Sequence, residues 1–314
     1  MHLPVPTDFL LPRDVASYGY FLLEPNHWLP GTTTRNGVFK RILDLPGGPV
    51  TLRITQPLGK GKPLSVALSR KLIAGEKAEL ARQVSRMLRL DEPVSTLREF
   101  HKLDPRWKKS GRGRLMRSPT LFEDIIKTVT SCNVAWPSTI RMNQRLCEVF
   151  GRGGAFPTAN IIAAQRPAAL RATCSVGYRD ARIVQLAKMF VSGEIDPAWF
   201  ENPATTDEAI RQRLIELPGI GPYAAANILQ LLGRFGHLPL DTESVRHGRV
   251  VLKMKGKGPA IMKRIARTFA PFGHHKFRSY WFELWLYYEA KRGPAHTWDR
   301  ETTGKTFTAA LLAE

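Results

Sequence analysis

The 314-residue chain carries 47 Lys and Arg against 27 Asp and Glu, and its formal charge of +20 favours a polyanionic partner. Its three cysteines, Cys132, Cys147 and Cys174, are odd in number and far apart, which excludes a disulfide framework and any zinc or iron–sulfur spacing. The start of the chain lacks the features of a secretory signal, and no apolar segment is long enough to span a bilayer. We therefore expect no membrane partner and a cytoplasmic location, nucleoid-associated if the source is bacterial.

The first part of the chain predicts a small antiparallel sheet. Apolar and polar residues alternate over 50–55 and again over 64–68, on either side of a Gly-Lys-Gly sequence at 59–61. This pattern is typical of two half-buried strands joined by a turn. We expect a β-rich N-terminal domain over residues 1–92.

Helical periodicity takes over after that region. Apolar residues share one helical face in 122–129 and in 183–190. Turn signals divide the remainder into about ten helices. The expected fold class is α+β: a small N-terminal antiparallel sheet followed by a mostly α-helical, two-lobed domain over 93–293. Residues 294–314 are polar and then weakly helical, so we expect a loosely attached tail.

The most informative motif is the sequence Leu-Pro-Gly-Ile-Gly at 217–221, in an expected helical hairpin at 210–233. Gly219 and Gly221 lack a Cβ, so the backbone can turn tightly between helices and leave its amides facing outward. Pro222 suits the first position of the next helix, because its missing N–H would be unpaired there in any case. Amides at such a helix start can hold a phosphate.

Asp241 follows the hairpin after a Gly/Pro-rich loop, and this arrangement resembles the helix-hairpin-helix (HhH-GPD) DNA glycosylases. Five further segments resemble the 8-oxoguanine and alkylpurine (3-methyladenine) branches of that superfamily: 113–117, 131–133, 145–151, 156–158 and 176–182. The resemblance implies an enzyme that flips a modified base out of double-stranded DNA and cleaves its N-glycosidic bond. It also implies a monomer.

Asp241 is the expected catalytic residue. Cleavage of an N-glycosidic bond passes through an oxocarbenium-like sugar, and a fixed carboxylate stabilises the positive charge that develops there. The same group can orient or deprotonate the attacking water. A purely structural alternative is that Asp241 caps a helix that begins at Thr242. Both roles are compatible in one residue.

Tyr223 stands where bifunctional members of the superfamily carry a lysine that forms a Schiff base with the sugar. No lysine occurs between Glu216 and Arg246. We therefore expect a monofunctional enzyme that uses water and leaves an abasic site. Tyr223 either stacks on the flipped base or packs the core of the hairpin.

Asn227 and Glu243 are candidates for reading the edge of the flipped base. Asn227 lies one helical turn after Tyr223 and shares its face, and Glu243 lies two positions after Asp241. In the resemblance to the 8-oxoguanine branch, both positions flank the extruded base. A glutamate accepts a hydrogen bond from a cytosine amino group, which favours a cytosine-like substrate. An exposed glutamate in a first helical turn is the commoner explanation of Glu243.

Asn133 matches the asparagine that enters the duplex in the 8-oxoguanine branch, and Trp136 is a candidate wedge beside it. The chain departs from that branch at Val134 and Ala135, where further asparagines are expected, so reading of the opposite base is altered or absent. The alternative for Trp136 is a buried helix anchor.

Basic residues gather before the second half of the chain. We expect Lys108, Lys109, Arg112 and Arg114 to contact DNA phosphates, because clustered cations suit a polyanionic backbone.

The resemblance further implies a Na⁺ or K⁺ ion at the hairpin, held by the backbone carbonyls of Ile215, Leu217 and Ile220. No cofactor is expected for catalysis. His274 and His275 lack partners at a zinc-binding spacing and are expected to be loop or cap residues.

Three hypotheses follow. The first is a monofunctional DNA glycosylase of base excision repair for an alkylated or oxidised purine. The second is a glycosylase for a modified pyrimidine, such as a bulky 5-substituted cytosine in phage DNA, with a role in defence. The third is a DNA-binding protein that keeps the hairpin without catalysis. The presence of Asp241 favours the first two.

Overall fold

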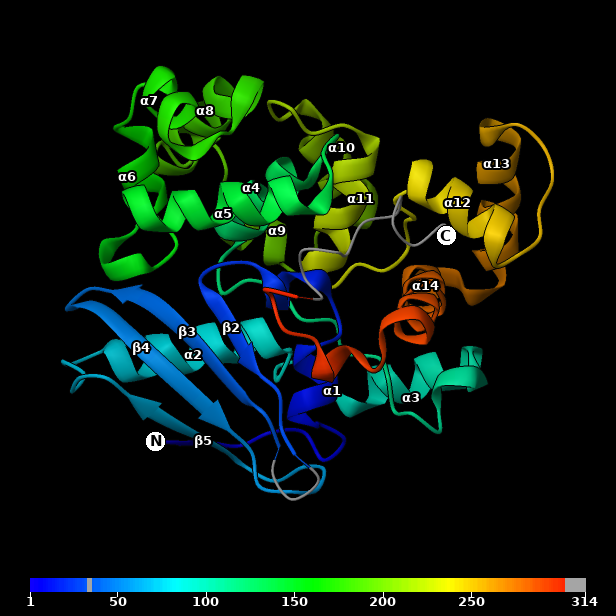
Figure 1. Cartoon of the computed structure of the whole chain (residues 1–314), viewed down its shortest axis with the longest axis horizontal. Helices are drawn as coiled ribbons and strands as arrows, with labels where there is room; N and C mark the ends of the chain where they lie inside the picture. The colour runs from blue at the N-terminus through cyan, green and yellow to red at the C-terminus, as the bar shows by residue number, and fades with distance from the viewer. Residues whose placement is uncertain (33–35, 303–314) are drawn as a thin grey trace.

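The computed structural model describes residues 1–32 and 36–302 and shows the expected α+β fold, with a sheet at one side and helices over the rest (Figure 1). The sheet is antiparallel, in the order β1-β5-β4-β3-β2. Its strands are β1 (His2–Leu3), β2 (Asn26–Leu29), β3 (Val38–Leu45), β4 (Gly48–Thr55) and β5 (Leu64–Leu68). The hairpin predicted around 59–61 is confirmed, because Ile54 pairs with Val66 and Leu52 with Leu68.

Two helices of the N-terminal region were not expected from the strand pattern. Residues that we predicted to be β-rich also form the short helix α1 (Leu11–Val15) and the longer helix α2 (Glu76–Leu88). Leu80, Val84 and Met87 recur at helical spacing and are buried in the same apolar cluster as the strands. Helix α2 therefore covers one face of the sheet (Figure 1).

The first helical lobe has its own apolar core, made from residues between Leu121 and Leu232. Its helices are α4 (Leu121–Ser131), α5 (Trp136–Phe150), α6 (Ala159–Ala163), α7 (Pro167–Cys174), α8 (Asp180–Val191), α9 (Pro197–Glu201), α10 (Asp207–Glu216) and α11 (Pro222–Leu231). The faces predicted at 122–129 and 183–190 are confirmed, since their apolar residues are buried in α4 and α8, with Phe190 partly buried at the end of α8.

The second lobe joins the two ends of the chain. Helices α12 (Thr242–Val250), α13 (Gly258–Phe269) and α14 (Lys276–Arg292) bury side chains such as Trp285 in the same cluster as Phe39 and Leu52 of the sheet. Helix α3 (Val94–Leu103) packs beside α14 through a smaller aromatic cluster. The core of this lobe therefore contains residues from both of the expected domains, 1–92 and 93–293.

The segment after α14 is not a loose tail as far as the structure describes it. Trp298 is fully buried, and its Nε1 donates a hydrogen bond to the Gly293 carbonyl at 2.8 Å. The burial of Trp298 could not be predicted from the sequence, because a single apolar residue in a polar segment does not form a periodic pattern. Residues 303–314 lie outside the described residues. In the described ranges, no helix has the length and apolar character needed to cross a membrane.

A buried charge cluster ties the sheet to the first helical lobe. Arg41 of β3 contacts Glu123 of α4 at 2.5 Å, and Glu123 contacts Lys127 one turn later at 2.7 Å. All three side chains are at most 3% exposed. Such a cluster is stable only while every charge keeps its counter-charge.

Replacing Glu123 with Gln should therefore destabilise the protein by about 3–5 kcal/mol, because two buried cations lose their shared anion. Urea unfolding followed by circular dichroism measures this loss. Glu79→Gln is the matched control, because the Glu79–Arg82 pair is exposed and should contribute less than about 1 kcal/mol. Equal effects of the two substitutions would contradict the structural role of the cluster.

Candidate active site

The glycine-rich hairpin joins α10 to α11. The side chains of Leu217 and Ile220 are buried in the core of the first helical lobe and anchor the turn from inside. Gly219 has a φ of +78°, a conformation that side chains with a Cβ rarely adopt. Pro222 occupies the first turn of α11, as predicted.

The backbone of this turn faces outward. Gly219 and Gly221 are exposed, and among the described residues neither amide donates a hydrogen bond to a protein acceptor. A Cβ built on Gly219 would lie 2.7 Å from Cδ of Arg182, so an arginine side chain lies directly against the turn. Two free amides beside a guanidinium suit a phosphate.

Asp241 is the N-cap of α12. Its Oδ1 accepts a hydrogen bond from the Ser244 amide at 2.9 Å, and the Asp241 amide donates to Oγ of Ser244 at 2.7 Å. This capping box fixes the carboxylate in one position. Asp241 is therefore a helix cap, and this role is compatible with a chemical one.

The environment of Asp241 raises the pKa of its carboxyl group. Burial raises the pKa of its carboxyl to about 6, against the opposing hydrogen bond from Ser244 and with a further rise from the charge on Glu243. Perturbed carboxyl groups of this kind concentrate at functional sites. At neutral pH the group is still ionised, as stabilisation of a cationic sugar requires.

Asp241 faces residues that are far away in sequence. The pKa of Cys132 is raised to about 11 by burial and then by the nearby Asp241 charge, with Arg179 opposing. The pKa of Tyr223 is raised by burial and by Asp241. The acid therefore lies where the start of α11, the α4–α5 turn and α12 meet, at the junction of the two lobes (Figure 1).

Aromatic side chains line this junction. Tyr223 is half-buried beside Tyr18, whose ring lies 4.7 Å from that of Trp281 between centroids. The contact between Tyr18 and Trp281 could not be read from the sequence, because the two residues come from opposite ends of the chain. We call Tyr223, Tyr18 and Trp281 the aromatic wall: Tyr223 is its member beside Asp241, and Tyr18 and Trp281 pack behind Tyr223.

Asn227 does not present a free amide to a base. Its Oδ1 accepts a hydrogen bond from the Tyr18 hydroxyl at 3.3 Å, and its Nδ2 donates to the Tyr223 carbonyl at 3.1 Å. The side chain is buried, with 6% of the residue exposed. The predicted role in edge recognition is therefore wrong in this structure, where Asn227 holds the aromatic wall together.

Glu243 is also occupied. Its carboxylate forms an ion pair with Arg246 on the next turn of α12 and accepts a hydrogen bond from the Tyr288 hydroxyl. Arg246 in turn stacks on Tyr287, 4.5 Å from the ring centroid. The structure thus uses Glu243 to attach α12 to α14, and the prediction that it reads a base edge is corrected.

Asn133 is exposed at the tip of the α4–α5 turn, with a φ of +54° that asparagine tolerates better than most residues. Arg179 holds this turn from behind, because its guanidinium donates to the Cys132 carbonyl at 2.5 Å and to the Val129 carbonyl at 3.2 Å. Asn133 is therefore presented outward on a fixed loop, and its contact with DNA stays a prediction.

Trp136 packs at the start of α5 and is partly buried. Its ring packs on the cluster that contains Tyr18 and Tyr20, and a Cβ built on Gly19 would lie 3.1 Å from it. The ring is only partly buried, so its contact with the duplex stays a prediction.

Tyr178 is a better candidate for contact with DNA, and sequence reasoning did not single it out. It is 54% exposed, and the guanidinium of Arg182 lies 5.2 Å from its ring centroid, beside the hairpin turn. The Gly-Tyr-Arg sequence at 177–179 was the available signal. An exposed aromatic ring flanked by arginine suits stacking on a base.

The four residues of the predicted basic cluster differ in exposure: the two arginines are buried or paired, and the two lysines are exposed. Arg114 is fully buried, where it pairs with Asp8 and donates to the Arg89 and Glu92 carbonyls, so its predicted phosphate contact is wrong. Arg112 pairs with Glu289 of α14 at 2.5 Å and is only partly accessible.

Lys108 and Lys109 are exposed. They follow α3, which lies on the opposite side of α14 from the hairpin helices (Figure 1). Their contact with phosphates stays a prediction.

The residues expected to hold a cation fit that purpose through their backbones. Ile215 lies in the last turn of α10, and Leu217 and Ile220 follow it in the turn. Carbonyls at the C-terminal end of a helix lack intrahelical partners and carry the negative end of its dipole. The Leu217 carbonyl also accepts a hydrogen bond from the Ile220 amide at 3.1 Å. The ion itself stays a prediction.

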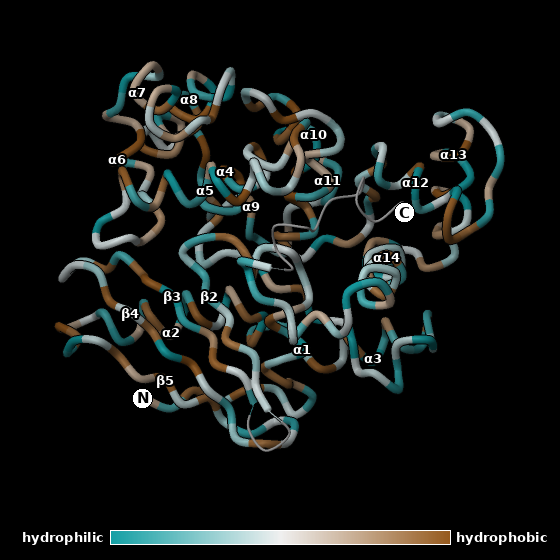
Figure 2. Tube along the Cα trace, in the orientation of Figure 1, coloured by the Kyte–Doolittle hydropathy of each residue, from teal (hydrophilic) through white to brown (hydrophobic). Residues whose placement is uncertain are grey.

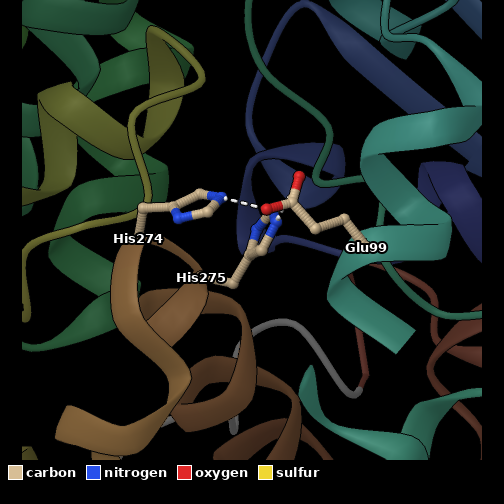
Figure 3. Close-up of side chains that lie close together, drawn as sticks. All are labelled: Glu99, His274 and His275. Carbon is tan, nitrogen blue, oxygen red and sulfur yellow. Dashed lines mark ion pairs between the residues drawn. The ribbon is translucent and has the colours of Figure 1, made fainter. Parts of the chain in front are cut away.

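Glu99, His274 and His275 lie close together between α3 and the start of α14 (Figure 3). Nε2 of His274 contacts Glu99 at 3.0 Å. Nδ1 of His275 accepts a hydrogen bond from Arg278, which leaves its proton on Nε2 in the neutral ring. Burial and the Arg278 charge lower the pKa of His275 to about 3. A protonated Nε2 beside a fixed guanidinium does not suit a metal ion.

Comparisons with known proteins support the fold over most of the chain. A 3-methyladenine DNA glycosylase from Archaeoglobus fulgidus matches with a TM-score of 0.62 and 22% identity, covering 91% of this chain and 97% of that one. The apo 8-oxoguanine glycosylase/lyase of Clostridium acetobutylicum matches with a TM-score of 0.63 and 16% identity, covering 90% and 94%.

A shorter match is the 3-methyladenine DNA glycosylase of Schizosaccharomyces pombe in complex with abasic DNA, with a TM-score of 0.50 and 23% identity over 62% of this chain and 97% of that one. No family model matches the sequence, and neither does any curated protein. The chain therefore has the fold of the helix-hairpin-helix DNA glycosylases, and both branches named from the sequence share it.

Asp241→Asn should stabilise the protein above pH 6. The carboxyl pKa is about 6 in the folded state against 3.8 in the unfolded chain, so ionisation of Asp241 costs folding free energy as the pH rises through 6. Asparagine keeps the cap without the charge. We expect a gain of roughly 1–3 kcal/mol at pH 8 that disappears below pH 4, measured by urea unfolding.

Ser244→Ala is the control, because it breaks the capping box without touching the carboxylate and should lower stability at both pH values. A pH-independent effect of Asp241→Asn would show that the carboxyl is not strained by burial.

Proposed function

We propose that the protein is a DNA glycosylase that hydrolyses the N-glycosidic bond of a modified base. The observation that carries the proposal is the position of Asp241, a partly buried carboxylate with a raised pKa at the start of α12, next to Tyr223 at the start of α11. The hairpin that precedes α11 offers free amides for a phosphate. An acid and a phosphate site on consecutive elements are the parts that base excision needs.

We propose further that the enzyme is monofunctional. Tyr223 stands where a lyase would carry its amine, and no lysine lies between Glu216 and Arg246. The buried Lys127 is paired with Glu123, which it shares with Arg41. Water, oriented by Asp241, is then the nucleophile.

An alkylated purine with a positive charge is the substrate that the surroundings favour. Tyr223 is a half-buried aromatic ring beside Asp241, while the amide of Asn227 and the carboxylate of Glu243 are used within the protein. A cationic base is attracted to an aromatic face, and this attraction does not require hydrogen bonds to the edge of the base. Its glycosidic bond is also weakened, so a single carboxylate suffices.

The pyrimidine alternative loses its support for the same reason, because it rested on Asn227 and Glu243. An oxidised guanine remains the second candidate on one observation, the likeness in fold to the 8-oxoguanine glycosylase/lyase.

A panel of duplexes tests the proposal. Each duplex carries one modified base, among them 7-methylguanine, 3-methyladenine, 8-oxoguanine and 5-hydroxymethylcytosine, and strand breaks are scored with and without hot alkali. We expect alkali-dependent breaks at the alkylpurines and a loss of at least 100-fold in single-turnover rate for Asp241→Asn, since one transition-state charge partner is removed.

Breaks without alkali would contradict the monofunctional assignment. Cleavage of no duplex would leave a DNA-binding protein as the better description, and release of 8-oxoguanine alone would replace the alkylpurine by the second candidate.

The hairpin has its own test in Gly219→Ala. A Cβ at this position meets Arg182 at 2.7 Å and points into the turn that would hold the phosphate. We expect at least tenfold weaker binding to a duplex with an abasic-site analogue, measured by fluorescence anisotropy.

Gly193→Ala is the matched control for Gly219→Ala. Its φ of +81° imposes a similar backbone strain, but nothing lies within 4 Å of its Cβ. Equal binding by the two variants would mean that the turn does not contact DNA.

A further inference from the structure

The segment that follows the candidate acid has an unusual charge pattern. No Asp or Glu occurs between Ser244 and Phe282, although the segment is rich in Lys and Arg. The exposed basic side chains on α12, α13 and the loop between them form what we call the α12–α13 basic surface: Arg249, Lys253, Lys255, Lys257, Lys263, Arg264 and Arg267.

These cations are not neutralised by the protein. In residues 1–32 and 36–302, no carboxylate lies within the 4.0 Å of an ion pair from any of them, whereas Arg211 and Arg213 of α10 each have a glutamate partner. Arg249 and Arg264 donate only to backbone carbonyls, at 3.4 Å to Gly256 and 3.2 Å to Lys255. The field of the surface is therefore directed outward, toward a polyanion.

Close packing fixes which side of this pair of helices faces solvent. A Cβ on Gly248 of α12 would lie 2.5 Å from Ile261 of α13, so the two helices touch at that point. Helix α13 buries Ile261, Ile265 and Phe269 and turns its basic side outward. Figure 2 shows the hydrophilic colours along the connection between the two helices, at the edge of the molecule.

The position of the surface relative to Asp241 is set by one short helix. Asp241 caps the first turn of α12, which has 9 residues, and the basic loop follows its last turn. At 1.5 Å per residue the loop lies about 13 Å from the acid along the helix, which corresponds to about four base pairs of B-DNA. The hairpin helices α10 and α11 lie on the other side of α12 from α13 (Figure 1).

We propose that the α12–α13 basic surface binds the phosphates of the duplex on one flank of the modified nucleotide, the flank opposite the hairpin. This inference rests on the proposed function, because it places the flipped nucleotide at Asp241. The contact would supply affinity and orientation for any base sequence, since phosphates carry no sequence information.

The test combines a charge variant with a matched control. Lys255→Gln, Lys257→Gln and Lys263→Gln together remove three charges from the surface. Lys62→Gln, Lys71→Gln and Lys77→Gln remove three exposed charges near the sheet, on the other side of the molecule. Thermal melting checks that both variants fold. Binding to an unmodified duplex is measured by fluorescence anisotropy between 50 and 200 mM KCl.

We expect the surface variant to bind about tenfold more weakly or worse at low salt, and its log–log salt slope to fall by about 2 to 3, because each lost phosphate contact removes about 0.9 from the slope. The control variant should differ from the wild type by less than about twofold. Equal losses in both variants would mean that only net charge matters and would overturn the proposal.

A second measurement locates the contact. Duplexes with a central abasic-site analogue carry an arm that is lengthened from 4 to 12 base pairs on one side or the other. Lengthening one arm, and not the other, should strengthen binding by the wild type, and the surface variant should lose this gain. Equal gains from both arms would overturn the assignment to one flank.

These binding experiments do not depend on catalysis. If the wild type released no base from any modified duplex, the proposed function would fail while the salt slopes and arm effects still tested the surface.

Discussion

The capping box at the start of α12 is the contact on which the candidate site depends. The Asp241 carboxylate caps the start of α12 and faces the junction of the two lobes. The Ser244 amide holds it there. A side chain on a flexible loop would rotate toward water, and its pKa would return to the ordinary range. Because the cap fixes Asp241 in a partly buried position, the protein keeps a raised pKa and a defined direction for a negative charge.

The arrangement of the lobes completes the site. The N-terminal sheet shares its core with the C-terminal helices, so Tyr18 and Trp281 meet although they lie at opposite ends of the chain. The buried cluster of Arg41, Glu123 and Lys127 fastens this lobe to α4. The aromatic wall next to Asp241 is thus a product of the whole fold, and the cost of an ionised buried acid is offset by packing elsewhere.

Local patterns were enough for much of this architecture. The alternation around 59–61 predicted the β4–β5 hairpin, and the glycine turn with its downstream acid predicted α10, α11 and the position of Asp241. Partners distant in sequence were not predictable. Asn227 is bonded to a tyrosine 209 positions away, and Glu243 to one 45 positions away, so neither is free for a base as its spacing suggested. Arg114 was misjudged likewise, because its acid partner comes from the N-terminus.

The most direct test of the catalytic claim is the pH dependence of single-turnover base release from a 7-methylguanine duplex between pH 5 and 8. If the ionised Asp241 stabilises the sugar cation, the rate should rise by up to tenfold per pH unit below about 6 and level off above it, following the carboxyl pKa of about 6. Asp241→Asn should be slow at every pH. A wild-type rate that does not change across pH 6, or an Asp241→Asn variant that matches the wild type, would contradict the account.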